Sequence, residues 1–314
     1  MEFNQKIIGH ILTIISTISG SFTCIISLIV CFLLIHHQYY HLSRKEEKII
    51  LLLSTNIYAL ILIYVIVLLT CNIQTLLGDV YGTNFNTSWC IFRSYLSSVL
   101  CCAVYAIFVT QALYRLFRIV YTYYRWLQFS RVYSISAPIH LVLSFGIASP
   151  LLIWNDIVYS PDDYQCLVPF SRTRGFLWTA FISYGAPLVY LSLISIHIAT
   201  FIRQQRNAVS LARNRSHQRD FRAIQRIFIQ IGILIAAGLP VIIFMLMFYI
   251  TGIEHPLSYR AAYLGVEVAL AVLSLMMILM TPQLRNIIIK KWKSNQVIVI
   301  QRPTPTRPSI PANK

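Results

Sequence analysis

The chain has 314 residues, of which 57% are hydrophobic and 11% are charged, whereas a soluble domain carries about 25% charged residues. This composition excludes an ordinary soluble domain and is typical of a protein embedded in a bilayer. The net charge of +16 does not indicate nucleic-acid binding, because the basic residues lie between long apolar segments. The first apolar segment, 7–35, is too long for the core of a signal peptide and predicts a first membrane span.

Seven segments approach the ~20 apolar residues that a spanning helix requires. We expect an all-α membrane protein, a seven-transmembrane helix bundle, with spans at about 7–35, 49–71, 90–117, 137–154, 176–202, 227–251 and 261–280. The bundle domain would cover 1–294. Within it, residues 283–294 combine apolar and basic side chains, which predicts a short amphipathic helix on the inner membrane surface. Residues 295–314 are expected to form a disordered cytoplasmic tail.

The distribution of lysine and arginine predicts the orientation, since cytoplasmic loops are enriched in both. With the N-terminus outside and the C-terminus inside, 21 of the 26 basic residues fall on the inner side. The other five are Lys6, Arg93, Arg172, Arg174 and Arg260. This orientation places Asn86, in the glycosylation sequon Asn86-Thr87-Ser88, in the first outer loop. We expect a multi-pass protein of the plasma membrane.

The cysteines indicate one disulfide and no metal site. None of the seven has CxxC spacing, and most lie inside apolar segments. Cys90 and Cys166 lie in polar segments that flank spans, which makes them the natural candidates for a disulfide. Both fall on the outer side in the expected orientation, where disulfides persist.

With these marks the chain resembles the rhodopsin-like (class A) G protein-coupled receptors. That family joins the outer end of its third helix to its second outer loop by a disulfide, and Cys90 and Cys166 occupy those places. The family also carries an Asp/Glu-Arg-Tyr motif at the inner end of the third helix, with the arginine 25 residues after the cysteine. Arg115 has that spacing from Cys90. The resemblance implies that Arg115, with Tyr114 and Arg118 beside it, takes part in coupling to a G protein.

The resemblance extends over about 7–294. Pro187 and Pro240 resemble the helix-kinking prolines of the family's fifth and sixth helices, and 281–285 resembles the junction after its seventh helix. Other family residues are replaced. Tyr114 stands where the acid precedes the arginine, an apolar residue near Ile61 stands in place of the sodium-binding carboxylate, and Gly238 stands where the family has tryptophan. The Asn-Pro-x-x-Tyr motif is not preserved near 273–277. These departures favour a divergent receptor for a peptide or a small chemosensory molecule.

The resemblance implies a ligand pocket between the outer halves of the third, fifth, sixth and seventh helices. Ser97, Ser98 and Glu267 lie at that depth and are the expected pocket residues. Glu267 lies within an apolar span, so it should face the bundle interior or water, or be neutral. Its alternative role is a structural hydrogen bond to Ser97, Ser98 or a tyrosine. The basic loop 203–226 would face the G protein, anionic lipid or both.

The expected partners are a heterotrimeric G protein, an extracellular ligand and the lipid bilayer, and not nucleic acid. HExxH, GxGxxG and GxxxxGK[ST] motifs are all absent, so we expect neither an enzyme nor a cofactor. Two alternatives stay open, which are a seven-span chemoreceptor channel of inverted topology and a small membrane transporter. The charge distribution argues against the first. The second usually shows internal repeats and more polar groups within the membrane.

Overall fold

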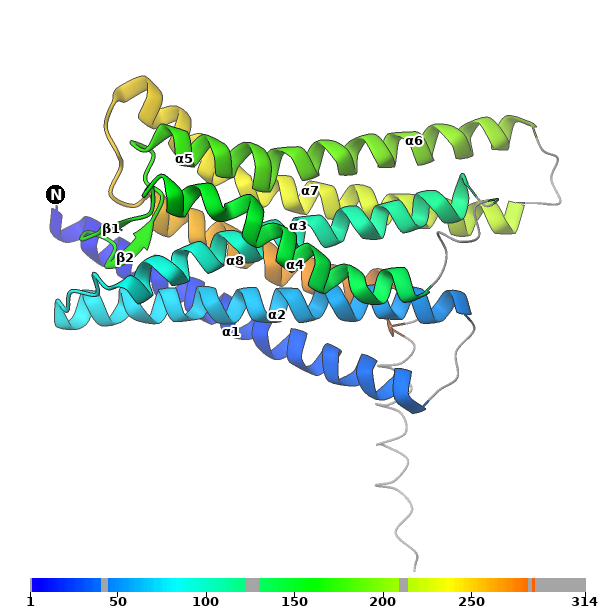
Figure 1. Ribbon diagram of the computed structural model, residues 1–314, viewed down its shortest axis with the longest axis horizontal. Helices are drawn as coiled ribbons and strands as arrows, with labels where there is room; N and C mark the ends of the chain where they lie inside the picture. Colours follow the sequence, from blue (N-terminus) through cyan, green and yellow to red (C-terminus); the bar gives the residue numbers. More distant parts are fainter. Residues whose placement is uncertain are drawn as a thin grey trace, which may run out of the picture.

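The computed structural model describes residues 2–40, 45–121, 123, 130–208, 214–281 and 284–285. Within these ranges seven helices are long and apolar enough to cross a membrane, and they run side by side along the length of the molecule (Figure 1). Each corresponds to one predicted span, so the expected helical bundle is confirmed. The amphipathic helix expected at 283–294 lies outside the described residues, apart from Leu284 and Arg285, and the tail 295–314 lies outside them entirely.

The helices are α1 (Glu2–Tyr40), α2 (Lys45–Tyr81), α3 (Ser88–Ile119), α4 (Ser130–Ile153), α5 (Thr173–Trp178), the π-helical turn η2 (Thr179–Gly185), α6 (Ala186–Ala208), α7 (Asn214–Thr251) and α8 (Ser258–Met280). The fifth of the seven spans consists of α5, η2 and α6 in succession. An antiparallel hairpin of β1 (Val158–Ser160) and β2 (Gln165–Leu167) connects α4 to α5. Strands this short leave little periodic signal in a sequence, and the hairpin was not predicted.

Several helices continue beyond the apolar stretch that predicts them. The second was expected to end at 71, yet α2 runs to Tyr81, and Asn72 and Thr75 in this extension are buried. The helix ends where the backbone changes, at Gly82 with φ of 64°. Gly252, with φ of 71°, follows the end of α7 in the same way. A glycine adopts this left-handed conformation without the steric cost of a Cβ, and it commonly terminates a helix.

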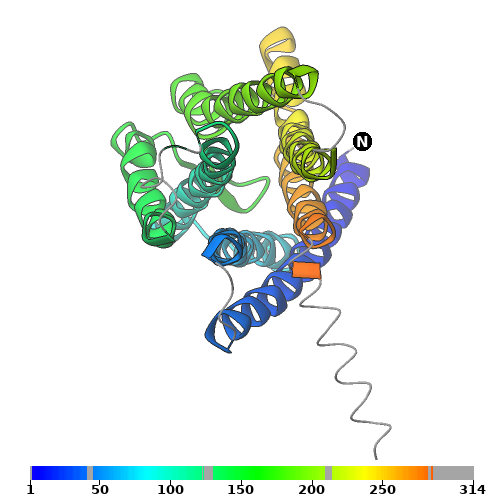
Figure 2. The same ribbon diagram turned by 90° about the vertical axis from the view of Figure 1, so that its right-hand side faces the viewer.

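The third helix lies inside the bundle. It packs against α2, α4 and α6, while α1 packs on α2 and α8, and α7 lies between α6 and α8; Figure 2 shows this arrangement along the helix axes. Tyr58, Ile61, Leu100 and Ile107 are among the largest fully buried side chains of the core. Ile61, near which the resemblance implies an apolar residue in place of a carboxylate, is therefore packed in an apolar centre.

The outward faces of the bundle are apolar as well. Ile18, Phe32, Val142 and Leu193 are examples of large side chains that are more than half exposed. A soluble monomer rarely exposes so much contiguous apolar surface. Together with the length of the seven helices, this surface indicates a multi-pass membrane protein.

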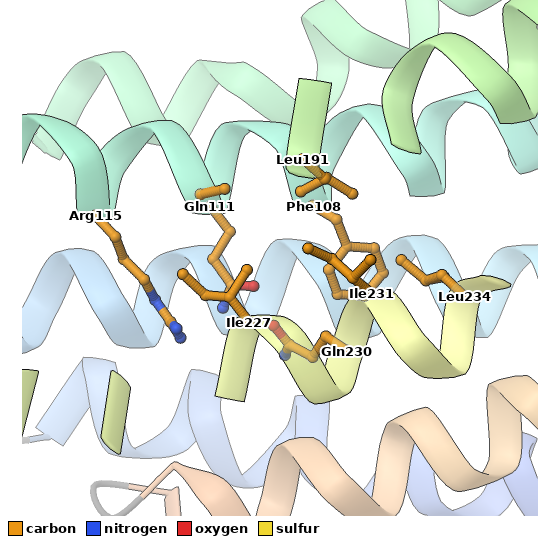
Figure 3. A pocket seen from close by; sticks show the side chains of 9 residues that line it. Phe108, Gln111, Arg115, Leu191, Ile227, Gln230, Ile231 and Leu234 are labelled. Carbon is orange, nitrogen blue, oxygen red and sulfur yellow. The ribbon is translucent and has the colours of Figure 1, made fainter. Parts of the chain in front are cut away.

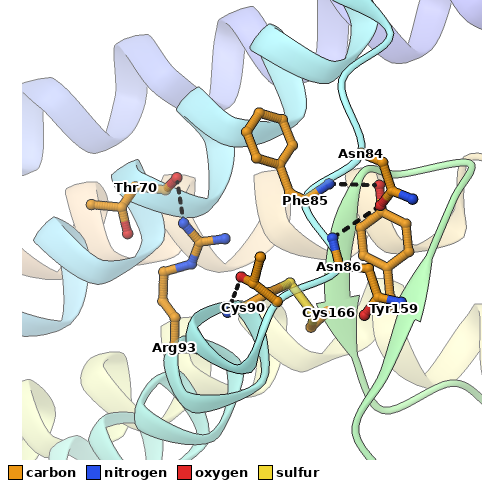
Figure 4. The surroundings of a disulfide bond; sticks show 9 residues. Thr70, Asn84, Phe85, Asn86, Cys90, Arg93, Tyr159 and Cys166 are labelled. Atoms are coloured by element: carbon orange, nitrogen blue, oxygen red, sulfur yellow. Dashed lines mark hydrogen bonds between the residues drawn. A yellow bond between two sulfur atoms is a disulfide. The ribbon is translucent and has the colours of Figure 1, made fainter.

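The two ends of the bundle differ. At one end Cys90 Sγ and Cys166 Sγ are bonded at 2.03 Å, which confirms the expected disulfide and ties β2 to the first turn of α3 (Figure 4). We refer to this as the disulfide end. The opposite end, where α3 carries Arg115, is the Arg115 end.

Candidate functional site

A cavity of about 410 Å³ lies between α3, η2, α7 and α8. Its wall includes Tyr105 of α3, Tyr184 of η2, Gly238 of α7 and Leu270 of α8. The volume is within the range of small-molecule sites, which are concave and mostly apolar. The four elements are the third, fifth, sixth and seventh spans in chain order, the same set from which the sequence analysis expects the ligand pocket to be built.

The wall of this cavity carries no aspartate, glutamate, lysine, arginine or histidine among the described residues. Two of its hydroxyl groups are directed to the backbone instead of the lumen. Thr179 Oγ1 donates to the Gly175 carbonyl at 3.0 Å, and Tyr184 Oη donates to the Ile235 carbonyl at 3.0 Å. The surface offered to a bound molecule is therefore uncharged and largely apolar.

A π-helical turn places Tyr184 in this wall. The Ala186 N–H donates to the Phe181 carbonyl, five residues back, which widens the helix by one residue. Pro187 follows immediately and has no N–H to continue the α-helical pattern behind it. The structure thus puts Pro187 at the junction of η2 and α6. Wide turns of this kind recur at functional sites.

Gly238 makes room for Tyr184. A Cβ at Gly238 would overlap the phenol ring of Tyr184, so this position accepts the tyrosine only because it lacks a side chain. The Tyr184 ring also meets Tyr105 edge to face at 5.5 Å between centroids, and its hydroxyl bonds to α7 at Ile235, five residues before Pro240. Gly238 thus leaves a gap in α7 that the ring of Tyr184 from η2 fills.

The three expected pocket residues do not line this cavity. Ser97 is buried, and Ser98 Oγ donates to the Ser94 carbonyl at 3.2 Å within α3. Glu267 lies on a different face of α8, toward α1 and α2. The structure separates all three from the cavity, while Tyr105, Tyr184 and Gly238, which the sequence analysis did not assign to it, form its wall.

Glu267 is fully enclosed, at 0% exposure. Its Oε2 accepts a hydrogen bond from Ser16 Oγ at 2.7 Å, and its Oε1 accepts one from Asn72 Nδ2 at 2.7 Å. A Cβ at Gly20 would come within 3.2 Å of Oε2, so α1 approaches closely here. Glu267 therefore joins α1, α2 and α8 through hydrogen bonds whose partners were not predicted. Asn72 was missed because it follows the apolar stretch that marked the second span.

An ion-pair network closes the disulfide end. Arg260 Nη1 lies 2.7 Å from Asp79 Oδ2, and Arg260 Nε lies 3.1 Å from Asp163 Oδ1, which links α8, α2 and the β1–β2 loop. His10 Nδ1 lies 3.3 Å from Asp79 Oδ2. Burial raises the pKa of Asp163 to about 6, although the neighbouring guanidinium opposes the rise. Arg260, counted with the outer basic residues, is 8% exposed and belongs to the bundle.

Arg93 is the second outer arginine that the structure buries. It points from α3 toward α2, where its Nη1 donates to the Thr70 carbonyl at 3.1 Å (Figure 4). Asn86, the sequon residue, is exposed in the connection between α2 and α3. Sequence reasoning treated all outer arginines as topology signals, whereas Arg93 and Arg260 hold helices together.

At the Arg115 end a small cavity lies between α3, α6 and α7. Arg115 lines it together with Gln111, Ile227 and Gln230, and its side chain extends past α3 toward α7 (Figure 3). Leu234 lines both this cavity and the larger one. The two sites therefore share a side chain of α7.

The residues beside Arg115 face elsewhere. Tyr114 is buried, and its ring meets Tyr133 of α4 edge to face at 5.0 Å. It packs with Ile49 of α2 in the same apolar cluster. Arg118 is exposed. The structure therefore directs Tyr114, Arg115 and Arg118, expected to act together, to three different surroundings.

No protein-family model matches this chain, and no curated protein matches it.

Proposed function

We propose that this chain is a rhodopsin-like G protein-coupled receptor, in which a ligand in the large cavity controls the Arg115 end and thereby activates a heterotrimeric G protein. The observation that carries the proposal is the shared wall of the two cavities. Leu234 of α7 lies in both, and α3 contributes Tyr105 to the first and Arg115 to the second. A shift of α7 that moves Leu234 in one cavity therefore also changes the wall of the other cavity.

The proposed switch uses the contact between η2 and α7. Tyr184 occupies the gap at Gly238 and bonds to α7 at Ile235, five residues before Pro240. A helix that contains proline lacks one backbone hydrogen bond there and deforms more easily. A ligand that packs better when Tyr184 or α7 is displaced would favour the displaced state by that difference in affinity. Arg115 lies ten residues from Tyr105 along α3, about 15 Å at the α-helical rise.

The proposal places the receptor in the plasma membrane with the disulfide end outside. The lysine and arginine distribution, the exposed sequon at Asn86 and the Cys90–Cys166 disulfide support this orientation. An epitope tag before Met1 should be reached by antibody on intact cells, and a tag after Lys314 only after permeabilisation. The reverse pattern would exclude the receptor and favour the inverted channel.

Nucleotide exchange tests the coupling. The full chain in nanodiscs should accelerate GDP release from at least one heterotrimer even without agonist, because the residue before Arg115 is Tyr114 instead of the acid that the family carries there. Arg115→Lys keeps the charge and removes the planar guanidinium fork, so it should lose most of this acceleration. Arg118→Lys, at an exposed position three residues on, should change it little. Equal activity of Arg115→Lys and the unmodified chain would contradict the assigned role, and no exchange with any heterotrimer would contradict the proposal.

A further inference from the structure

The large cavity suits a molecule without charge. Among the described residues, its wall holds no aspartate, glutamate, lysine, arginine or histidine, and two charged residues of α8 are engaged outside the cavity. Glu267 binds Ser16 and Asn72, and Arg260 pairs with Asp79. A carboxylate or ammonium placed in the cavity would lose its hydration without meeting an opposite charge, which is strongly unfavourable. A neutral molecule incurs no such penalty.

An aromatic stack closes the cavity toward the disulfide end. Phe176 lines the cavity, and Phe170 covers it with ring centroids 4.9 Å apart. Phe170 is 2% exposed and also stacks on Tyr259 of α8 at 4.9 Å and on Phe248 of α7 at 6.1 Å. Its backbone N–H donates to Tyr259 Oη at 2.9 Å. This stack joins α5, α7 and α8, so aromatic side chains cover the cavity on the side that faces the disulfide end.

The side of the cavity between η2 and α7 is different. Phe181 of η2 lines the cavity and is 66% exposed, and Ile242 of α7 lines it and is 38% exposed. Ala180 and Met245, which also line it, are partly exposed. These side chains lie within apolar spans, where the surroundings of the bundle are lipid. The cavity is therefore bounded by lipid-facing side chains on this flank.

We propose that the cavity takes a neutral, largely apolar small molecule that reaches it from the bilayer, between η2 and α7. The inference rests on the proposed function in treating this cavity as the ligand site of a receptor, and it adds the ligand class and the route. The binding experiments that test it use no G protein. Binding without nucleotide exchange would refute the receptor and leave this inference standing, whereas exchange driven by a charged ligand in the cavity would do the reverse.

The ligand class is tested with three probes of one chain length. They are a medium-chain primary alcohol with a diazirine in the chain, and the carboxylate and ammonium analogues. The full-length protein in phosphatidylcholine nanodiscs is photolabelled at equal probe content of the bilayer, and labelled peptides are identified by mass spectrometry. The alcohol should label 179–185 and 237–245 saturably, and the two ions at least about tenfold less, because burying an unpaired charge costs more than the 1.4 kcal/mol of a tenfold difference. Equal labelling by all three would overturn the ligand class.

Cavity-filling variants localise the labelling. Ala237→Trp places an indole in the cavity from α7, and Ala269→Phe fills it from α8. Each should abolish saturable labelling while the disulfide-bonded protein retains a cooperative melt. Ala236→Trp is the matched control, because Ala236 neighbours Ala237 but faces outward. Undiminished labelling of both filled variants would show that the probe binds elsewhere and would overturn the proposal.

The route is tested by a pair of phenylalanine truncations. After equilibration with the alcohol probe, an excess of the same alcohol without the diazirine is added, and the delay before the flash gives the dissociation rate. Phe181→Ala opens the flank and should speed dissociation several-fold. Phe170→Ala, and Phe170→Leu beside it as the variant that keeps an apolar side chain, should leave the rate unchanged. Faster release from the Phe170 variants, with none from Phe181→Ala, would place the route at the disulfide end and overturn the lateral one.

Discussion

The buried carboxyl of Glu267 gives the sharpest test of how α1, α2 and α8 are held together. Replacing it with leucine keeps a side chain of similar length and removes both acceptors at once. Ser16 Oγ and Asn72 Nδ2, each 2.7 Å from a carboxyl oxygen, then lose their partner in a fully enclosed site. Asn72 Nδ2 also lies 3.3 Å from Ser16 Oγ, so these two groups retain one hydrogen bond between them.

Two estimates of the free-energy cost of Glu267→Leu differ. Leaving a buried polar group without a partner costs about 1–3 kcal/mol in soluble proteins, which for two groups amounts to about 2–6 kcal/mol. Within a membrane the average measured interhelical hydrogen bond is worth about 0.6 kcal/mol and the largest about 1.7, because the unfolded chain also finds partners there. Since two hydrogen bonds are lost and one remains between Ser16 and Asn72, we expect Glu267→Leu to lower the free energy of unfolding by about 1–3 kcal/mol.

The assay is unfolding in detergent or bicelles, with two comparisons. Glu267→Gln should cost less than about 1 kcal/mol, because its amide oxygen accepts from Asn72 and its amide nitrogen donates to Ser16 Oγ. Adding Asn72→Leu to Glu267→Leu should recover part of the loss, with a coupling energy of about 0.5–3 kcal/mol. Strict additivity of the two leucine substitutions, or a Glu267→Gln variant as unstable as Glu267→Leu, would refute the hydrogen-bond account.

Three further outcomes follow from the structure. Cys90→Ser and Cys166→Ser should each lower the free energy of unfolding by about 2–5 kcal/mol and reduce delivery to the cell surface. Mass spectrometry of the unreduced protein should find the two cysteines joined, and free thiols at both would contradict the structure. Gly78→Ala should destabilise by about 1–3 kcal/mol, because its Cβ would overlap the ring of the tyrosine preceding β2, whereas Gly146→Ala meets nothing within 4 Å and should be neutral or stabilising. The pKa of Asp163 in the folded protein, about 6, exceeds its ordinary value of 3.8. The folded state therefore binds this proton more tightly than the unfolded state, and the stability contributed by Asp163 rises as the pH falls from about 7 to about 5. The melting midpoint measured relative to Asp163→Asn should rise over the same range, and a constant difference would show that Asp163 does not titrate there.

Much of the site lay beyond what the sequence could predict, for a physical reason that differs between residues. Ser97 and Ser98 were expected at the pocket from their depth along α3, but depth says nothing about which face of a helix a side chain occupies. Ser98 turns to its own backbone. Tyr184 reaches the cavity because a π-helical turn changes the register of its helix, and no residue spacing reveals that turn in advance. The sequence marked Gly238 only as the position where the resembling family has tryptophan, whereas in the structure the ring of Tyr184 from η2 fills the space beside this glycine.

The sequence by itself determined the seven spans and the candidate disulfide, because both follow from local properties. A run of about 20 apolar residues is long enough to cross a bilayer wherever it lies, and Cys90 and Cys166 stand out through their polar neighbours. The tertiary structure alone decided which polar groups meet. Glu267 finds Asn72 at a separation of 195 residues, and Arg260 finds Asp79 at 181. Such partners depend on how the helices rotate against one another, and that rotation is set by the packing of the whole bundle.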